Sequence, residues 1–304
     1  MILRHYLGLD LRPRQLGAVA LCRKGRGMTL VGGRVVSLPE EVVLPSLRSP
    51  NILDRPRLVA ALRDVLHPIA GREERLSVAL PDGAGRVLLL DVEMPFKSKS
   101  EGLQVLRWQL RNTLPIDPEE LCLDYQIIEH KEDGGLRLAV AVMTRTVLHQ
   151  YEEVLEEAGY HGVVIDFHSL QLYNYYRARL DLGADTVFVS VEDGALGMQC
   201  FEDHRLIFHR SREIGHDLDM VYRELTRSLV AARELCPGLR RAQLFLHTDW
   251  PEQEALREAL RLLLEREATL LEPNLQRLTV GDIDIPNWRT RGLAAAVGAA
   301  ERLM

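Results

Sequence analysis

Two short polar turns between apolar strands are the places in this chain where side chains could bind phosphate. The first follows Asp10 in the segment 7–21, and the second lies near Glu192 in the segment 187–201. A phosphate-binding turn brings a glycine backbone close to the phosphate and surrounds its oxygens with backbone N–H groups and hydroxyl side chains. The chemistry of both turns therefore depends on whether they supply glycine, serine and threonine.

The first turn keeps an acid but lacks the residues that would surround phosphate. Asp10 could orient Mg²⁺ or water, yet Arg12 stands where glycine is needed. Pro13 has no N–H to donate. Arginine can bind phosphate by its charge, but we expect Arg12 and Arg14 to be solvated loop residues. A Mg²⁺ site shared by Asp10 and Asp166 is disfavoured, because single acids are common at strand ends.

The second turn has two possible registers, and neither supplies phosphate chemistry. In the better strand register, Ser190 and Glu192 stand where an acid and a glycine are required. A shifted register uses Asp193 and Gly194 instead, but it then places residues 196–198, Leu-Gly-Met, where hydroxyl donors belong. We expect Asp193 and Gly194 to form a hairpin turn.

No other arrangement of residues indicates catalysis or a metal site. The ten histidines are scattered, and the four cysteines lack metal-ligand spacing and lie in apolar runs, as buried thiols do. The net charge of −6 argues against a broad nucleic-acid surface. No run is long and apolar enough to span a membrane, and the first residues do not resemble a signal peptide. We therefore expect a cytoplasmic protein.

Alternating strands and helices indicate an α/β fold with two similar halves. A chain of 304 residues is long enough for two domains. Segments 6–11 and 16–22 read as strands joined by a turn, followed by a third at 28–37 with a bulge. After a linker at 181–186, the strand–turn–strand pattern returns at 187–201. This repetition predicts two lobes with a cleft between them.

Residues 84–160 follow a different order, which indicates an α+β insert. A strand at 86–92 precedes a helix at 103–114 whose apolar side chains recur every three or four residues, and Pro115 is expected to stop it. A hairpin at 124–143 and a second helix complete the insert.

The residues of the insert carry a resemblance to a known family. They are Pro95, 108–115, 124–128 and 151–160. A helix ending in Leu-Pro, an Asp-Tyr strand and a helix ending in Ala-Gly recur in this order in PilM-like chains. The chain thus resembles the actin/FtsA superfamily and, within it, the PilM family of type IV pilus assembly proteins, with GspL-type and MshI-like proteins close by. The resemblance implies an α/β, actin-like (ribonuclease H-like), duplicated two-lobe fold with an FtsA/PilM-type α+β insert subdomain.

The resemblance also implies a division into domains. It assigns residues 1–83 and 161–180 to the first lobe, 84–160 to the insert and 184–304 to the second lobe. FtsA ends in a basic amphipathic membrane helix. The segment 292–303 is instead rich in alanine and carries little charge, so we expect it to pack inside the second lobe.

Members of this superfamily bind ATP through three turns, and all three depart from the pattern here. The third normally has two glycines against the adenosine, whereas this chain has Trp250, which we expect to block the pocket. If a nucleotide binds at all, the resemblance assigns it to Asp10, Asp193, Gly194 and Gly215. We expect a pseudo-ATPase with no catalytic residue, metal or cofactor, with ATP and Mg²⁺ as the alternative that the family offers.

The PilM resemblance implies a non-catalytic cytoplasmic scaffold in the inner-membrane platform of a type IV pilus or a related type II secretion system. It would bind the N-terminal tail of a PilN-like membrane protein in a groove between the first lobe and the insert. The strand 86–92 and the helix 103–114 are the first places to seek that groove. Nucleic acid and direct membrane insertion are not expected, and homo-oligomerisation is left open. The alternatives are an active actin-like ATPase or phosphotransferase, or an FtsA-like filament-forming protein.

Overall fold

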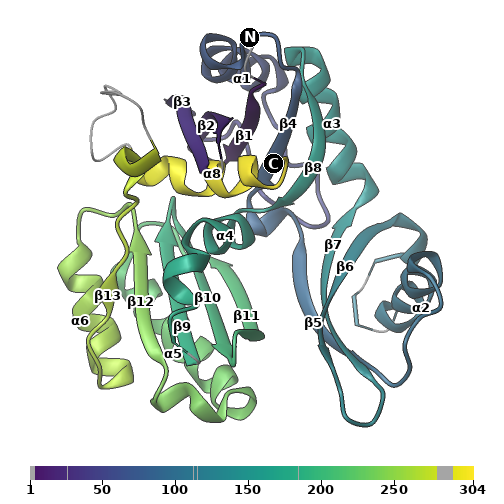
Figure 1. Ribbon diagram of the computed structural model, residues 1–304, viewed down its shortest axis with the longest axis vertical. Helices are drawn as coiled ribbons and strands as arrows, with labels where there is room; N and C mark the ends of the chain where they lie inside the picture. Colours follow the sequence, from purple (N-terminus) through teal and green to yellow (C-terminus); the bar gives the residue numbers. More distant parts are fainter. Residues whose placement is uncertain (1–3, 26, 112, 115, 184, 279–289) are drawn as a thin grey trace.

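Two five-stranded sheets form the centres of two lobes, and a three-stranded sheet forms a separate insert (Figure 1). The computed structural model describes residues 4–25, 27–111, 113, 114, 116–183, 185–278 and 290–304. The first sheet has the order β3-β2-β1-β4-β8, and the second has the order β11-β10-β9-β12-β13. Because the two orders correspond strand by strand, the expected duplicated α/β fold is confirmed.

The first sheet combines an antiparallel half with a parallel half. Its strands are β1 (Tyr6–Leu11), β2 (Gln15–Lys24), β3 (Gly27–Ser37), β4 (Arg75–Leu80) and β8 (His161–Phe167). Strands β3, β2 and β1 are antiparallel neighbours, whereas β4 runs parallel to both β1 and β8. The bulge expected in β3 is present, and Val31 is its extra residue, because Leu30 and Gly32 pair with consecutive residues of β2.

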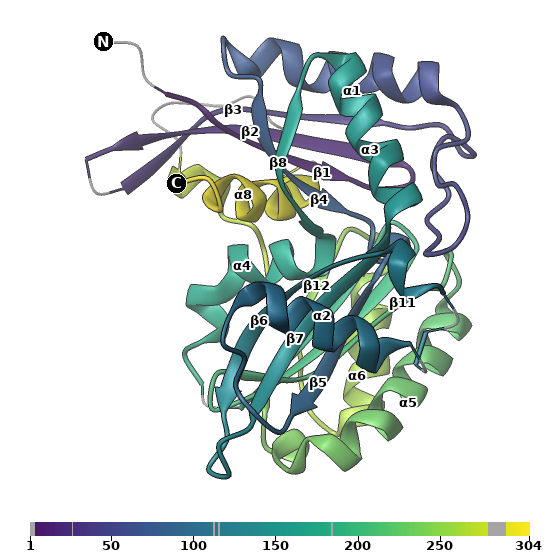
Figure 2. The ribbon, with the colours of Figure 1, turned by 90° about the vertical axis from the view of Figure 1, so that its right-hand side faces the viewer.

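Two helices cover one face of this sheet, α1 (Arg55–Ala70) and α3 (Arg145–Ala158) (Figure 2). Asp54 caps α1 by accepting a hydrogen bond from the N–H of Arg57. Gly159 ends α3 in the left-handed conformation with φ of 96°, as its position in the sequence predicts. Tyr151 and the other buried residues of α3 lie in the core of the first lobe. Helix α3 thus follows the insert in the chain but packs against the first lobe.

The insert has a core of its own. Its elements are β5 (Arg86–Val92), α2 (Lys99–Leu110), β6 (Leu121–His130) and β7 (Leu136–Thr144). Leu106 and Leu110 of α2 pack against the sheet β5-β7-β6. Helix α2 was expected to continue to residue 114 but ends at Leu110. The expected stop, Pro115, lies outside the described residues, as does Asn112.

The second lobe repeats the plan of the first. Its strands are β9 (Asp185–Glu192), β10 (Ala195–Glu202), β11 (Arg205–Glu213), β12 (Gln243–Thr248) and β13 (Thr269–Leu270). Helices α5 (Leu218–Leu235) and α6 (Gln253–Leu264) cover its outer face (Figure 1). As predicted, Asp217 caps α5 by accepting a hydrogen bond from the N–H of Asp219. Among the described residues, no helix is both long and apolar enough to cross a membrane.

Helices α4 (His168–Leu180) and α8 (Ala294–Glu301) lie between the two lobes (Figure 2). The expectation that the C-terminal segment packs inside the second lobe is wrong, because Ala296, Val297 and Ala300 pack against β2 and β3 of the first lobe. At the other end of the same helix, Ala294 and Ala295 contact the core shared by α4 and the second sheet. Alanine side chains make α8 thin enough to fit between two layers of structure.

Close backbone approach at Gly8 makes this packing sensitive to a single methyl group. A Cβ on Gly8 would lie 2.0 Å from the carbonyl oxygen of Ala296, whereas a Cβ on Gly27 would have no neighbour nearer than 3.8 Å. We predict that Gly8→Ala lowers the free energy of unfolding by about 1–3 kcal/mol, because α8 must shift. Gly27→Ala, also in a strand, should change it by less than about 0.5 kcal/mol. Urea denaturation of both variants checks this, and equal stabilities would contradict the packing role of Gly8.

Candidate functional site

The two polar turns come together between the lobes. In the first sheet Asp10 pairs with Gly17, and in the second Ser190 pairs with Gly197. Two residues further along, Arg12 and Glu192 therefore occupy the same position in the two halves of the fold. Their side chains form an ion pair across the cleft, with Nη1 3.3 Å from Oε1. The two positions where phosphate binding requires glycine carry opposite charges that neutralise each other.

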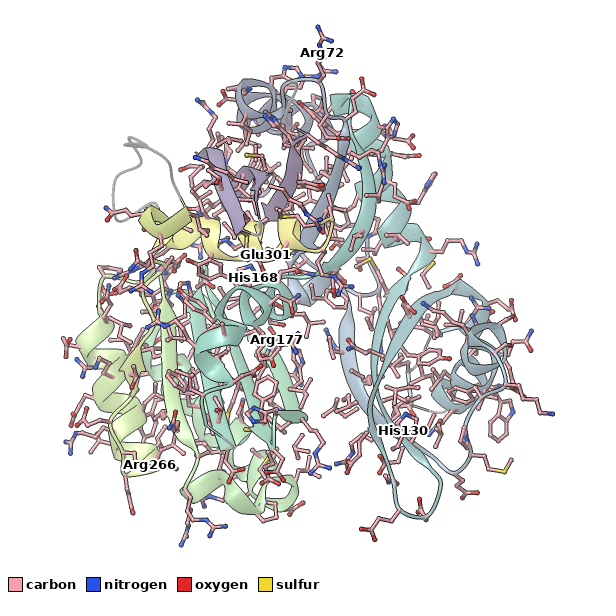
Figure 3. All side chains as sticks on the ribbon, in the orientation of Figure 1. Arg72, His130, His168, Arg177, Arg266 and Glu301 are labelled. Atoms are coloured by element: carbon pink, nitrogen blue, oxygen red, sulfur yellow. The ribbon has the colours of Figure 1, made fainter. Side chains whose placement is uncertain are left out.

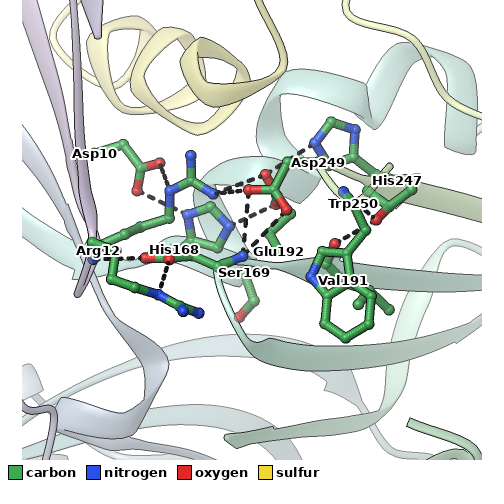
Figure 4. Close-up of polar contacts among 12 residues, drawn as sticks. Asp10, Arg12, His168, Ser169, Val191, Glu192, His247, Asp249 and Trp250 are labelled. Atoms are coloured by element: carbon green, nitrogen blue, oxygen red, sulfur yellow. Dashed lines mark hydrogen bonds and ion pairs between the residues drawn. The ribbon is translucent and has the colours of Figure 1, made fainter. Parts of the chain in front are cut away.

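Arg12 is at the centre of this ion pairing (Figure 4). Its side chain is only 3% exposed, with Nε 3.2 Å from Asp10 and Nη1 3.0 Å from Asp249. Burial by itself would lower the pKa of Arg12, but Asp10, Glu192 and Asp249 outweigh burial and raise it. The expectation that Arg12 is a solvated loop residue is therefore wrong, because three carboxylates compensate for its loss of water.

His168 completes the site from the first lobe, at the junction of β8 and α4. Its Nδ1 lies 2.8 Å from Asp10 and its Nε2 lies 2.9 Å from Glu192. Burial opposes the protonated form, but the two carboxylates raise the pKa of His168 well above its ordinary value. His168 is thus an imidazolium that donates both N–H groups to carboxylates. The sequence gives no signal for it, because only the folding of β8 beside β4 brings it to the two turns.

Glu192 is the acid that contacts basic side chains of both lobes. Besides Arg12 and His168, it contacts His247 of β12, whose Nε2 lies 3.2 Å from its Oε1. Burial would raise the pKa of Glu192, but His247, His168 and Arg12 together hold it well below its ordinary value. The carboxylate therefore stays ionised inside the protein and binds the two lobes together.

The four residues to which the resemblance assigns a nucleotide lie at this junction and have partners within the protein. Asp193 and Gly194 form the predicted hairpin turn, with φ of 45° and 78°. The carboxylate of Asp193 accepts hydrogen bonds of 2.9 Å from both the backbone N–H and Nε of Arg14. The carbonyl oxygen of Gly194 accepts the N–H of Gly215 at 2.9 Å. Asp10 belongs to the same network through His168.

Trp250 fills space beside the end of β12. Its backbone N–H donates to the hydroxyl of Thr248 at 3.0 Å. Its buried indole ring stacks on His216, with the ring centroids 5.0 Å apart. The indole therefore lies in the second-lobe core at the turn where glycines would leave room for adenosine.

Asp166 does not approach Asp10. Both residues pair with Ala79 of β4, which separates them within the sheet. The carboxylate of Asp166 accepts a hydrogen bond of 3.0 Å from Gln171, and burial raises its pKa. Across the described part of the chain, no cluster of three or more His, Cys, Asp or Glu side chains has the geometry to hold a metal ion.

A separate groove of about 310 Å³ lies between the first lobe and the insert. Strand β8 and helix α3 line it from the first lobe, and β6 and β7 line it from the insert. The elements expected to border such a groove, β5 and α2, do not line it. The buried leucines of α2, Leu106 and Leu110, face the core of the insert, and β5 lies beside β11 of the second lobe (Figure 1).

Two strands that have no neighbour on their outer side among the described residues border this groove. Strand β8 is the last strand of the first sheet, and β6 is the last strand of the insert sheet. The edge of each strand offers backbone N–H and C=O groups without a neighbouring strand. Val163 of β8 adds an apolar side chain that is 43% exposed. An extended peptide could pair with such an edge and place alternate side chains in the groove.

Comparison with known proteins shows which solved structures share this fold. No family model and no curated protein matches the sequence. A chain of a solved PilM–PilN type IV pilus biogenesis complex superposes with a TM-score of 0.76 and 19% identity, covering 97% of both chains. A Bacteroides thetaiotaomicron protein with an actin-like ATPase fold and unknown function gives 0.54 and 15%, covering 89% of this chain and 91% of that one. The cytoplasmic domain of EpsL, an inner-membrane component of the Vibrio cholerae type II secretion system, gives 0.52 and 11%, covering 96% and 94%. The chain therefore has the actin-like fold in a PilM-like form, as expected.

The protonation of His168 predicts a pH-dependent contribution to stability. Because its pKa is raised on folding, this contribution is complete below the unfolded pKa of about 6.5 and is lost as the pH rises through the folded pKa. We predict that His168→Gln lowers the free energy of unfolding by about 3 kcal/mol at pH 6, and by less at pH 9.

Urea denaturation at the two pH values measures the difference. The same substitution at His149, which is exposed on α3, should cost less than about 0.5 kcal/mol at either pH. A larger cost of His168→Gln at pH 9 than at pH 6 would contradict the imidazolium assignment.

Proposed function

We propose that this chain is a non-catalytic cytoplasmic scaffold in the inner-membrane assembly platform of a type IV pilus or a related type II secretion system. The observation that carries the proposal is the groove between β8 and β6, which has an unpaired strand edge on each side. The similarity in fold to the PilM–PilN complex and to EpsL supports a role in such an assembly. A scaffold needs a surface that recognises a partner, and this groove provides one.

The partner that we propose is the N-terminal cytoplasmic tail of a PilN-like inner-membrane protein. Leu123, Val163 and Ile165 give the groove an apolar lining, and Glu152 and Asp166 lie beside them. An extended tail with alternating apolar residues and a basic residue matches this surface, because the strand edges supply main-chain hydrogen bonds and the carboxylates attract the cation. The chain would then reach the inner membrane through this partner, without inserting into the bilayer itself.

The network around Arg12 supports the non-catalytic part of the proposal. Phosphoryl transfer needs side chains that position phosphate, Mg²⁺ and a nucleophile. Here the carboxylate of Asp10 contacts Arg12 and His168 instead, and Glu192 fills the second glycine position. We therefore propose a pseudo-ATPase, in which the former nucleotide turns hold the lobes together.

Val163 provides a direct test of the groove. We predict that Val163→Asp weakens binding of the tail at least tenfold, because it places a charge against an apolar side chain of the peptide. The probe is a fluorescent synthetic peptide that copies the N-terminal tail of the PilN-like protein encoded in the same genome. Fluorescence anisotropy measures its dissociation constant.

Val31→Asp is the matched control. Val31 lies on β3, the opposite edge strand of the same sheet, and is 44% exposed. This variant should bind the peptide as the unmodified protein does. If the peptide does not bind, or if both variants bind it equally well, the proposed groove is not the binding site.

The pseudo-ATPase proposal has an independent test. We predict that the protein releases no phosphate from Mg-ATP above the rate of a protein-free blank, with or without the tail peptide, because the side chains at both phosphate turns are already paired. A phosphate-release assay makes the measurement. It uses about 1 mM ATP, so that even a weak site is occupied. Turnover that disappears in Asp10→Asn would overturn the proposal in favour of an active enzyme.

A further inference from the structure

A cavity of about 490 Å³ opens where the first lobe, the insert and the second lobe meet. The loop 45–48 and Gly83 line it from the first lobe, Arg86 and Leu114 from the insert, and residues 211–213 from the second lobe. Strands β5 and β11, which carry part of this lining, lie side by side in Figure 1. The volume is within the range of small-ligand pockets.

Three arginines line this cavity, and no carboxylate of the described residues forms an ion pair with them. They are Arg48, Arg86 and Arg212, one from each part of the molecule. Arg86 donates to the carbonyl oxygen of its neighbour Gly85 at 2.7 Å, and Arg212 donates to that of Ser211 at 2.8 Å. A guanidinium has five N–H donors. Most of the donors at this cavity are therefore available to a ligand.

Folding brings like charges together here. The surrounding protein, Arg210 and Arg86 lower the pKa of Arg212 by more than Glu224 raises it. Arg210, two residues earlier on β11, does have a carboxylate partner, because its Nη2 lies 3.1 Å from Glu224 of α5. The positive charge around Arg86 and Arg212 therefore lacks the compensation that its neighbour has.

Glu213 is the carboxylate among the described residues that line this cavity. The surrounding protein, together with Asp82 and Asp193, raises its pKa to about 7, although Arg14 and His168 oppose the rise. Near neutral pH Glu213 thus gains a proton readily and becomes a hydrogen-bond donor. The cavity then has three cations and little negative charge.

We propose that this cavity binds a phosphate-bearing small molecule, held by the guanidinium groups of Arg48, Arg86 and Arg212. Guanidinium groups match phosphate oxygens in geometry as well as in charge. A compact cavity suits a di- or triphosphate group better than an acidic protein segment, which would need an elongated groove. A bound phosphate group would also join the first lobe, the insert and the second lobe, and so fix the insert relative to both lobes.

Calorimetric titration with sodium pyrophosphate at low ionic strength tests this proposal. We expect saturable binding with a dissociation constant below about 1 mM, and at least tenfold weaker binding in Arg86→Ala and in Arg212→Ala. Arg72→Ala is the control, because Arg72 projects into solvent from the end of the first lobe furthest from the second lobe (Figure 3). A parallel titration with ATP distinguishes two sources of the phosphate. If ATP binds more tightly than pyrophosphate, the ligand is a nucleotide. If the two bind equally well, the ligand is an inorganic phosphate compound.

Two further variants separate binding from folding. Arg212→Ala removes a crowded surface charge, so its melting temperature should equal or exceed that of the unmodified protein. Glu213→Gln should tighten pyrophosphate binding at pH 8, where the carboxylate is mostly ionised and repels the anion. Absence of pyrophosphate binding, or equal binding by Arg72→Ala and Arg212→Ala, would overturn the proposal. Stronger competition by a hexaglutamate peptide than by pyrophosphate would overturn it in favour of an acidic protein partner.

Discussion

The ion pair between Arg12 and Glu192 is the constraint on which the arrangement of the two lobes depends. Each residue stands at the same position of its own half, and the two charges meet across the cleft at 3.3 Å. Buried charges are costly unless they are paired, and removing one partner typically costs about 3–5 kcal/mol. His168, Asp10 and Asp249 extend the pair, so that two cations face three carboxylates in a site with little access to water. The cleft is held closed by opposite charges.

This network changes what an actin-like fold can do. Turns that would approach phosphate with glycine instead carry side chains that bind each other, and Trp250 is packed against His216 at the third turn. Catalysis by positioning needs groups that are free to contact the substrate. The fold then contributes a rigid frame, in which the thin helix α8 touches the cores of both lobes and Gly8 allows its close approach.

Two further surfaces lie where separate parts of the frame meet. Between the first lobe and the insert, unpaired strand edges and an apolar lining suit an extended peptide. Where the insert meets the second lobe, Arg86 and Arg212 suit a phosphate group. Each surface includes residues from the insert.

The sequence by itself determined the strands, most of the helices and the replacement of glycine by Arg12 and Glu192 at the two turns. Those features depend on local signals, namely apolar periodicity, caps such as Asp217, and the Asp193-Gly194 hairpin. The sequence did not determine the burial and ion pairing of Arg12, the role of His168 or the position of α8. An arginine in a loop is solvated unless acids from distant segments surround it, and His168 and Glu192 are brought together only by the packing of two lobes. Such contacts depend on the global arrangement of the sheets, which only the tertiary structure decides.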